Sequence, residues 1–238
     1  MTDAHPEERQ HEPEGGESIA VRIPAGEAML EGDFGIPRGA RGVVLFAHGS
    51  GSSRHSPRNR YVARVLRQAG LATVLFDLLT QEEESIDIRT AELRFNIALL
   101  AQRLLQASDW MAGQPQAKGL PFGYFGASTG AAAALVAAAQ APRPPAAIVS
   151  RGGRPDLAGA ALLRVQTPTL LIVGGEDGQV IDLNRRAMNL LRCEKRLEII
   201  PSATHLFEEP GTLEQVARLA RDWFVARLGM RQDRPNVA

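Results

Sequence analysis

The chain has 238 residues, 44% of them hydrophobic, which is enough apolar material for one large domain with a buried core. Lysine plus arginine and aspartate plus glutamate number 27 each, so this formally neutral chain has no overall field to attract nucleic acid or an anionic membrane. The single cysteine excludes an internal disulfide. No apolar stretch is long enough to span a bilayer, and we expect a cytoplasmic protein.

The two ends differ in composition from the rest of the chain. Residues 1–17 are rich in Glu, Pro, Gly and His and contain few apolar side chains, and residues 230–238 are similar. We expect the first segment to be disordered and the second to be a flexible tail. The polar, acidic N-terminus has no apolar core of the kind that a secretory signal needs. Residues 18–229 contain no repeat or linker, which predicts one domain.

Between the ends, apolar runs alternate with helical patterns. Residues 19–23 and 28–34 flank a P-A-G-E turn, which predicts an antiparallel hairpin. Further apolar runs predict strands at residues 43–47, 73–76, 122–125, 147–150, 169–173 and 197–200. Apolar residues at helical spacing predict helices at residues 59–68, 90–111, 129–140, 181–191 and 213–228, with a short helix at 157–165.

This alternation predicts the fold class. Strands that are apolar along their whole length are buried on both faces. Joined by helices, they form right-handed βαβ units, which predicts an α/β domain with a mostly parallel central sheet and helices on both faces. Residues 151–168 have room for a turn and one short helix, so we expect no lid domain. Ligands of such sheets bind beyond the carboxyl ends of the strands.

Ser128 stands in the segment YFGASTG, between a predicted strand and an alanine-rich helix. The spacing G-x-S-x-G suits a nucleophile on a sharp strand-to-helix turn, because the glycines relieve crowding and the helix N-terminus points N–H groups at the reacting carbonyl. The alternative is a phosphate-binding turn or a simply capped helix. Because the segment lacks both the P-loop lysine and the spacing G-x-G-x-x-G, we favour a nucleophile.

An acid and a histidine follow at the ends of later strands. Glu176 and Asp177 come after the strand at 169–173, where a carboxylate could orient a histidine or could belong to a solvated Asp-Gly turn. We favour Asp177, which lies one step deeper in the loop. His205 is the only one of the five histidines that follows this acid, although a lone loop histidine is usually a surface residue. The order Ser128, Asp177, His205 predicts a catalytic triad.

The segment HGSGSS follows the strand at 43–47 and is rich in glycine, which exposes backbone amides. We assign the N–H groups of Ser50 and Thr129 to an oxyanion hole. His48 is expected to brace this loop. A metal site at His48 and His55 is disfavoured, because no cysteine or acid completes a ligand set, and we expect no cofactor.

Arginines gather in loops that follow the strands. Arg54 comes after the oxyanion loop, and Arg151 comes after the strand at 147–150. Either guanidinium could bind a carboxylate or phosphate of the substrate. The alternative is that both are ordinary surface arginines, with Asp156 neutralising Arg151 or Arg154.

Together, the segments HGSGSS, YFGASTG, LLIVGGED and ATHLFEEPG resemble the dienelactone hydrolase branch of the α/β-hydrolase superfamily, over about residues 19–228. The resemblance implies the α/β-hydrolase fold and a cofactor-independent hydrolase of esters, lactones or related acyl compounds. The best-known members of the family have a cysteine where this chain has Ser128, and a glutamate where it has Gly49. The two differences go together, because a serine needs no control of a thiolate.

The expected function is that of a serine hydrolase acting on a small acyl substrate, without a nucleic acid or membrane partner. The chain also resembles hydrolases encoded beside, or fused to, phosphoribosyltransferases, which implies a partner of that kind. The alternative function is a catalytically weak binding or regulatory module that retains the fold, because one fold can host many functions.

Overall fold

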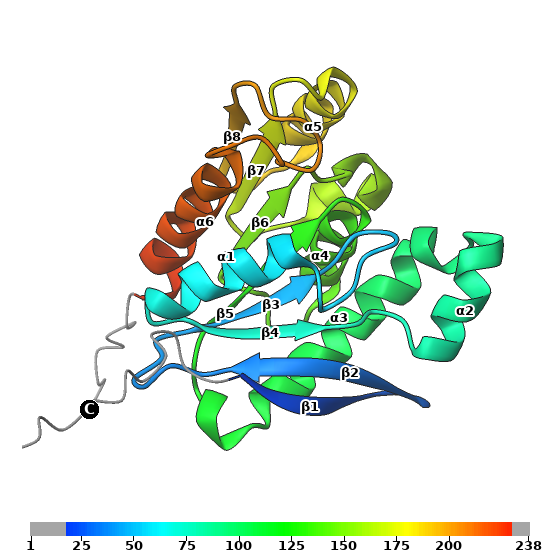
Figure 1. The fold of residues 1–238 in the computed structure, drawn as a ribbon, viewed down its shortest axis with the longest axis vertical. Helices are drawn as coiled ribbons and strands as arrows, with labels where there is room; N and C mark the ends of the chain where they lie inside the picture. Colours follow the sequence, from blue (N-terminus) through cyan, green and yellow to red (C-terminus); the bar gives the residue numbers. More distant parts are fainter. Residues whose placement is uncertain (1–17, 230–238) are drawn as a thin grey trace, which may run out of the picture.

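The computed structural model describes residues 18–229, in which eight strands form a single sheet with the order β1-β2-β4-β3-β5-β6-β7-β8 (Figure 1). The strands are β1 (Ser18–Ala25), β2 (Ala28–Gly35), β3 (Val43–Ala47), β4 (Ala72–Phe76), β5 (Phe122–Ala127), β6 (Ala147–Arg151), β7 (Thr169–Gly174) and β8 (Lys195–Ile200). Strand β2 pairs antiparallel with both β1 and β4, and all other neighbours are parallel. The predicted mostly parallel sheet with an N-terminal hairpin is confirmed.

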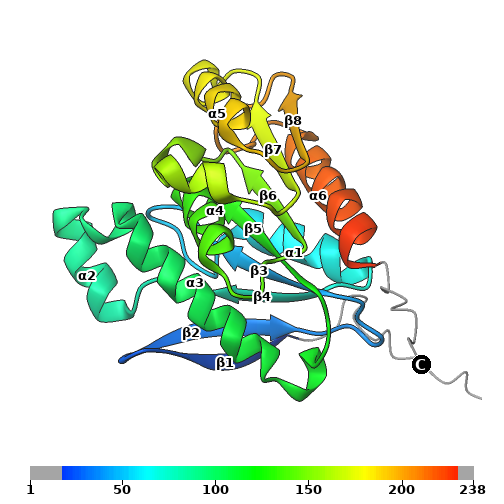
Figure 2. The ribbon, with the colours of Figure 1, turned by 180° about the vertical axis from the view of Figure 1, so that it is seen from behind.

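Helices cover both faces of the sheet. The helices are α1 (Pro57–Gln68), α2 (Gln81–Thr90), α3 (Ile97–Ala112), α4 (Thr129–Gln140), α5 (Gly178–Leu190) and α6 (Thr212–Leu228), with short 3₁₀ helices η1 (Leu93–Phe95), η2 (Pro115–Ala117) and η3 (Pro155–Arg164). One hydrophobic core joins the sheet to α1 and α6, which lie in front in Figure 1. A second core joins the other face to α3 and α4, which lie in front in Figure 2. Strands β3 to β7 are buried throughout, because they have helices on both sides.

The prediction of one helix over residues 90–111 is wrong. The structure has α2 before this segment, then η1, and only then α3. Ala91 adopts the left-handed conformation, with φ of 56°, which ends α2. The Oδ1 atom of Asn96 then accepts the Leu99 N–H at 3.1 Å and caps a new helix. The short helix expected at residues 157–165 is present as η3.

The tails expected at residues 1–17 and 230–238 lie outside the described residues. Within residues 18–229, none of the helices has the length and apolarity needed to cross a membrane.

The carboxyl ends of the parallel strands β3, β5, β6, β7 and β8 all lie on the same side of the sheet. The loops that follow these ends carry Ser50 after β3, Ser128 after β5, Asp177 after β7 and His205 after β8. The topology therefore brings residues from distant parts of the chain to one place, as expected for a site at the carboxyl ends of strands.

Candidate active site

Ser128 lies on a strained turn between β5 and α4, with φ of 50° and ψ of −120°. Such angles are unfavourable for a residue with a Cβ and persist only where the surroundings fix them. Here the Ser128 N–H donates to the Arg151 carbonyl at 3.3 Å, and the Ser128 carbonyl accepts N–H groups from Ala131 and Arg154 at 3.1 and 3.0 Å. The backbone on both sides of the turn is therefore held, and it matches the predicted nucleophile elbow.

Gly130 lets α4 approach strand β3 closely. A Cβ added at Gly130 would lie 2.2 Å from the Ala47 carbonyl oxygen and 2.4 Å from that of His48. Both atoms belong to the backbone that leads into the oxyanion loop, so they cannot move without displacing that loop. The glycine of the motif is thus required by the packing of the start of α4 against the loop after β3.

We expect Gly130→Ala to destabilise the protein strongly, by more than about 3 kcal/mol, because the added methyl overlaps buried backbone. Gly178→Ala is the matched control, since a Cβ there meets no atom within 4 Å, and it should change stability by less than about 0.5 kcal/mol. Chemical denaturation of both variants measures the effect. Equal stability of the two variants would contradict the packing argument.

Asp177 and His205 are joined by a hydrogen bond of 2.6 Å, in which the imidazole Nδ1–H donates to the carboxylate Oδ2. The side chain of Asp177 is 16% exposed, whereas Glu176 is an exposed residue. Backbone bonds join the two loops, because the N–H groups of Gly175 and Glu176 donate to the carbonyls of Ile200 and Ala203. The structure therefore brings the predicted acid and base together and favours Asp177 over its neighbour.

Gly152 brings the His205 loop close to the end of β6. Its φ is 51°, and a Cβ there would lie 3.1 Å from the His205 carbonyl oxygen and 3.5 Å from its Cε1 atom. Gly152 directly follows Arg151, whose carbonyl binds the Ser128 N–H. The imidazole of His205 thus lies near Gly152 at the end of β6, with its Nδ1 turned to Asp177.

Ser50 and Thr129, the predicted oxyanion donors, lie next to each other. The Ser50 N–H donates to the Thr129 Oγ1 atom at 3.1 Å, and the two hydroxyl groups are 3.0 Å apart. Thr129 is the first residue of α4, so its own N–H has no acceptor within the helix. In this structure the Thr129 hydroxyl accepts the Ser50 N–H. A substrate oxygen that bound to the Ser50 N–H would have to replace this hydroxyl as its acceptor.

His48 braces the oxyanion loop, as expected. Its Nε2 accepts the Leu78 N–H at 3.0 Å, so the proton is on Nδ1, which lies 2.9 Å from the Gly49 carbonyl oxygen. Burial lowers the pKa of His48 below its usual value of 6.5, against the opposing effects of the Gly49 carbonyl and of Asp77. A neutral imidazole thus ties the end of β4 to the loop that carries Ser50.

This lowered pKa predicts an acid-sensitive step in stability. The unfolded state binds the proton more readily than the folded state, so the contribution of neutral His48 is complete above about pH 6.5 and is lost as the pH falls from there through the folded-state pKa. We expect His48→Gln to be less stable than the wild type at pH 8 but to lose less stability between pH 8 and pH 5.

Thermal melts across this pH range test the prediction, with His55→Gln as the control, because His55 is an exposed histidine. The His55 variant should follow the wild-type curve. If the His48 variant lost as much stability towards pH 5 as the wild type, another group would be responsible for the acid step.

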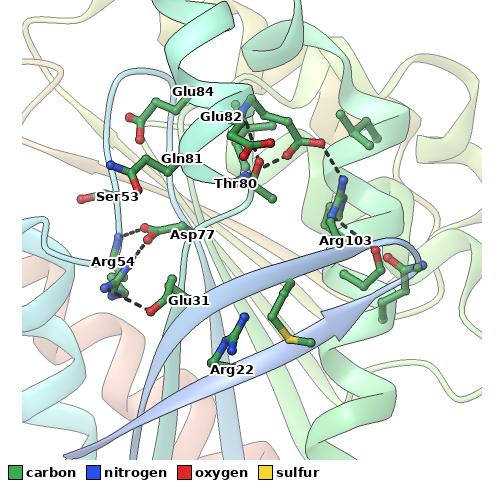
Figure 3. A pocket seen from close by; sticks show the side chains of 18 of the residues that line it. Arg22, Glu31, Ser53, Arg54, Asp77, Thr80, Gln81, Glu82, Glu84 and Arg103 are labelled. Carbon is green, nitrogen blue, oxygen red and sulfur yellow. Dashed lines mark hydrogen bonds and ion pairs between the residues drawn. The ribbon is translucent and has the colours of Figure 1, made fainter.

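Arg54 is surrounded by carboxylates. Its guanidinium pairs with Asp77, and its backbone N–H donates to the same carboxylate at 2.7 Å (Figure 3). Glu31 and Asp33 of the hairpin lie 3.8 and 4.0 Å from the guanidinium. This charge is already compensated, so the expectation that Arg54 binds an anionic substrate does not fit its surroundings.

Arg151 has the opposite environment. Its side chain is buried, and its Nε and Nη1 atoms have no hydrogen-bond partner among the described residues. Asp156 does not compensate it, because this carboxylate binds Arg154 at 2.9 and 2.7 Å. Burial, and then the neighbouring charge of Arg58, lower the pKa of Arg151 to about 10, so the group keeps its proton at neutral pH. An unpaired buried cation is costly, which makes Arg151 a candidate for binding an anion.

Sequence reasoning missed one part of the site, which is the contribution of α2. Helix α2 and η1 lie beside the oxyanion loop, and a small pocket there is lined by Asp87, Ile88 and Arg94 together with Ser50 and Thr129. The segment QEEESIDIRT is polar and has no helical apolar stripe, so its pattern carried no signal of a helix that packs near the site.

Comparisons with known proteins identify relatives of this chain, although no family model matches it. Two proteins of Mycobacterium tuberculosis, from strains CDC 1551 and H37Rv, are provisionally described as phosphoribosyl transferases and are 58% identical over 208 residues. The match covers 87% of this chain but 46% of theirs, so the chain spans about half the length of these curated relatives.

Solved structures give a fuller match. A dienelactone hydrolase from Anabaena variabilis is 61% identical, with a TM-score of 0.87, and the match covers 90% of this chain and 99% of that one. Est1E from Butyrivibrio proteoclasticus shares the fold at 14% identity, with a TM-score of 0.74 over 89% of this chain and 99% of its own. The fold is the α/β-hydrolase fold, and the chain belongs to the dienelactone hydrolase family.

Proposed function

We propose that this protein hydrolyses an ester or lactone through a Ser-His-Asp triad formed by Ser128, His205 and Asp177. The observation that carries the proposal is the 2.6 Å bond between His205 and Asp177, at the edge of the sheet where Ser128 occupies its strained turn. Asp177 fixes the proton on Nδ1 of the imidazole, which leaves Nε2 free to take the Ser128 proton. The serine oxygen attacks the acyl carbon, and water then releases the acyl group from the enzyme.

The backbone amides of Ser50 and Thr129 stabilise the negative oxygen that forms in this attack. Ser50 lies in the loop after β3, which His48 ties to the end of β4, and Thr129 begins α4, which is packed in the core. The Ser50 N–H, which donates to the Thr129 hydroxyl in this structure, would turn from that hydroxyl to the substrate oxygen. Losing one such donor typically slows the reaction by about a hundredfold or more.

Labelling with a fluorophosphonate probe tests the assignment, because such a probe forms a bond only with an activated serine. We expect the folded wild-type protein to become labelled once, on Ser128, and heat-denatured protein to remain unlabelled. Mass spectrometry of the digested protein locates the label. Folded protein that stays unlabelled would favour the alternative of a binding module with this fold.

The Nε and Nη1 atoms of Arg151, which have no hydrogen-bond partner among residues 18–229, support a preference for substrates with an anionic group on the alcohol side. Its backbone adjoins Ser128, and Gly152 beside it packs against His205, which must protonate the leaving group. A carboxylate or phosphate near this leaving group would supply the missing partner of Arg151. The surrounding carboxylates make Arg54 the suitable control rather than a second anion site.

We expect the wild type to hydrolyse an aryl acetate with a carboxylate on the aryl ring about tenfold faster, or more, than the neutral ester, judged by kcat/KM. Arg151→Gln should abolish this ratio and Arg54→Gln should keep it. Because the ratio compares two substrates on one protein, it does not depend on the folded fraction. Equal ratios in all three proteins would leave Arg151 without a role in substrate choice.

A phosphoribosyltransferase partner is part of the same proposal, supported by the description of the mycobacterial relatives and by their length beyond the matched part. Mixing this chain with the unmatched half of such a relative, followed by size-exclusion chromatography, tests it. Separate elution at micromolar concentrations would argue against a stable complex.

A further inference from the structure

The loop between β8 and α6, coloured orange in Figure 1, carries His205. The backbone N–H and carbonyl of His205 make no hydrogen bond within residues 18–229, so its place depends on its neighbours. On one side, the Ala203 carbonyl accepts the Glu176 N–H at 3.0 Å. On the other side, Phe207 is buried and its N–H donates to the Thr204 carbonyl at 3.2 Å. The backbone is thus held on both sides of the histidine but not at the histidine itself.

The same loop contains two residues with an unfavourable backbone conformation. Ser202 has a φ of 60° and Phe207 has a φ of 56°, and both side chains have a Cβ. Such angles persist only where surrounding contacts hold the chain. Because these residues lie on either side of His205, the loop depends on bonds to other groups to keep the imidazole in place.

The side chain of Glu209 supplies such a bond. Its Oε2 atom accepts the N–H of Thr204, the residue directly before His205, at 3.1 Å. Within residues 18–229, no other side chain forms a hydrogen bond with the backbone between Ala203 and Phe207. The carboxylate therefore closes the loop across the histidine.

The backbone of Glu209 is itself tied to α6. Its carbonyl accepts the N–H of Thr212 at 3.1 Å and the hydroxyl of the same residue at 2.7 Å. Thr212 is buried and is the first residue of α6, which packs against the sheet in one of the two cores. A line of contacts thus leads from a fixed helix, through Glu209, to the backbone next to His205.

The charge of Glu209 strengthens its bond to the loop. Hydrogen bonding, first from the Thr204 side chain and then from backbone N–H groups that include that of Thr204, lowers the pKa of Glu209 below its usual value. The group is therefore a carboxylate at neutral pH. An ionised acceptor forms a stronger bond with an N–H than a neutral acceptor does.

The neighbouring Glu208 makes a different contact. Its carboxylate lies 3.2 Å from Nη1 of Arg58 on α1, and its side chain is 65% exposed. An exposed ion pair of this kind contributes little to the stability of a loop. The two adjacent glutamates therefore carry the same charge, but only Glu209 bonds to the backbone beside His205.

We propose that Glu209 is a positioning residue, which holds the loop of His205 so that the imidazole meets both Asp177 and Ser128. It acts through the Thr204 N–H and does not touch the substrate. The inference rests on the proposed triad and adds the residue that orients its base. Because a misplacement of about 1 Å can slow a reaction by about a hundredfold, loss of this bond should affect the rate more than the stability.

The kinetics of Glu209→Ala and Glu209→Gln with 4-nitrophenyl acetate test the proposal. His205 serves in both the formation and the hydrolysis of the acyl-enzyme, so we expect Glu209→Ala to lower kcat by about tenfold or more and to change KM by less than about twofold. Glutamine keeps an oxygen that can accept the Thr204 N–H, so Glu209→Gln should stay within about threefold of the wild type. Glu208→Ala is the matched control and should also stay within about threefold.

Proton NMR gives a second readout, which does not depend on hydrolysis. The Nδ1–H proton between His205 and Asp177 is expected far downfield, and its absence in His205→Gln assigns it. We expect this resonance to be broadened or lost in Glu209→Ala and kept in Glu209→Gln and Glu208→Ala. Should Glu209→Ala fail to fold, Glu209→Asp takes its place in both measurements, because it keeps the charge but is one methylene shorter.

Wild-type kinetics and an unchanged resonance in Glu209→Ala would overturn the proposal, as would a change in only one of these measurements or a wild type without the resonance. An equal defect in Glu209→Gln or Glu208→Ala would also overturn it, because charge rather than this hydrogen bond would then be responsible. If the wild type hydrolysed no ester and Ser128 stayed unlabelled, the proposed function would fail. The resonance would still decide whether Glu209 holds His205 against Asp177.

Discussion

Ser128→Ala abolishes the hydrolysis of 4-nitrophenyl acetate, by a factor on the order of a millionfold if the triad acts as it does in other serine hydrolases. The reason is that, in the proposed mechanism, the Ser128 oxygen forms the acyl-enzyme. The melting temperature should stay close to that of the wild type, because alanine tolerates a φ of 50° no worse than serine does and the Ser128 hydroxyl makes no hydrogen bond within residues 18–229. Initial rates and thermal melts measure the two expectations.

Ser202→Ala is the control for this loss. Ser202 is also a serine with a positive φ, of 60°, in a loop at the same edge of the sheet, but it is exposed. It should retain near-wild-type activity and fluorophosphonate labelling. If the Ser128 variant kept more than a few per cent of the wild-type rate, the nucleophile would have to be sought elsewhere.

Asp177→Asn should lower kcat by roughly ten-thousandfold while leaving the fold intact. The amide of asparagine can donate a hydrogen to Nδ1, which would hold the imidazole in the tautomer whose Nε2 carries a proton and cannot accept one from Ser128. The carboxylate that stabilises the imidazolium in the transition state is also lost. Steady-state kinetics at a pH where the wild type is fully active measures the change.

Glu176→Gln separates this effect from a general loss of negative charge in the loop. Glu176 is exposed, and its backbone N–H, which the substitution retains, is the group that binds the Ala203 carbonyl. We expect less than about a threefold change. The opposite result, with a severe defect in the Glu176 variant and a mild one in Asp177→Asn, would show that Glu176 rather than Asp177 is the acid.

The site could be predicted to the extent that its geometry follows from topology. Parallel strands that are apolar throughout end at one edge of the sheet, so the residues after them meet there whatever their distance in the sequence. That rule sufficed to predict that the loops of Asp177 and His205 lie together, whereas the choice of Asp177 over Glu176 came from its deeper place in the loop. The role of Ser128 in catalysis remains a prediction, although its turn has the expected strained backbone.

What could not be predicted depends on contacts between segments with no shared pattern. Arg54 is compensated by Glu31 and Asp33, which reach it only because the hairpin pairs antiparallel with β4. Helix α2 owes its place to the polar cap at Thr80 and to the bonds of Asp87, and such a helix leaves no apolar periodicity to detect. Local charge partners and polar helices are thus visible only in three dimensions.

The order of the strands has a consequence for the newly made chain. The proposed triad is completed by the loop after β8, the outermost strand of the sheet and the last strand within residues 18–229, and the adjoining face is covered when α6 packs against α1. His205 follows Asp177 by 28 residues, so at about 5–20 residues per second it leaves the ribosome roughly 1.5–6 s later. If Ser128 and His205 act as proposed, a nascent chain that ends before His205 contains the nucleophile without its base, and hydrolysis would begin only when the final quarter of the domain has emerged.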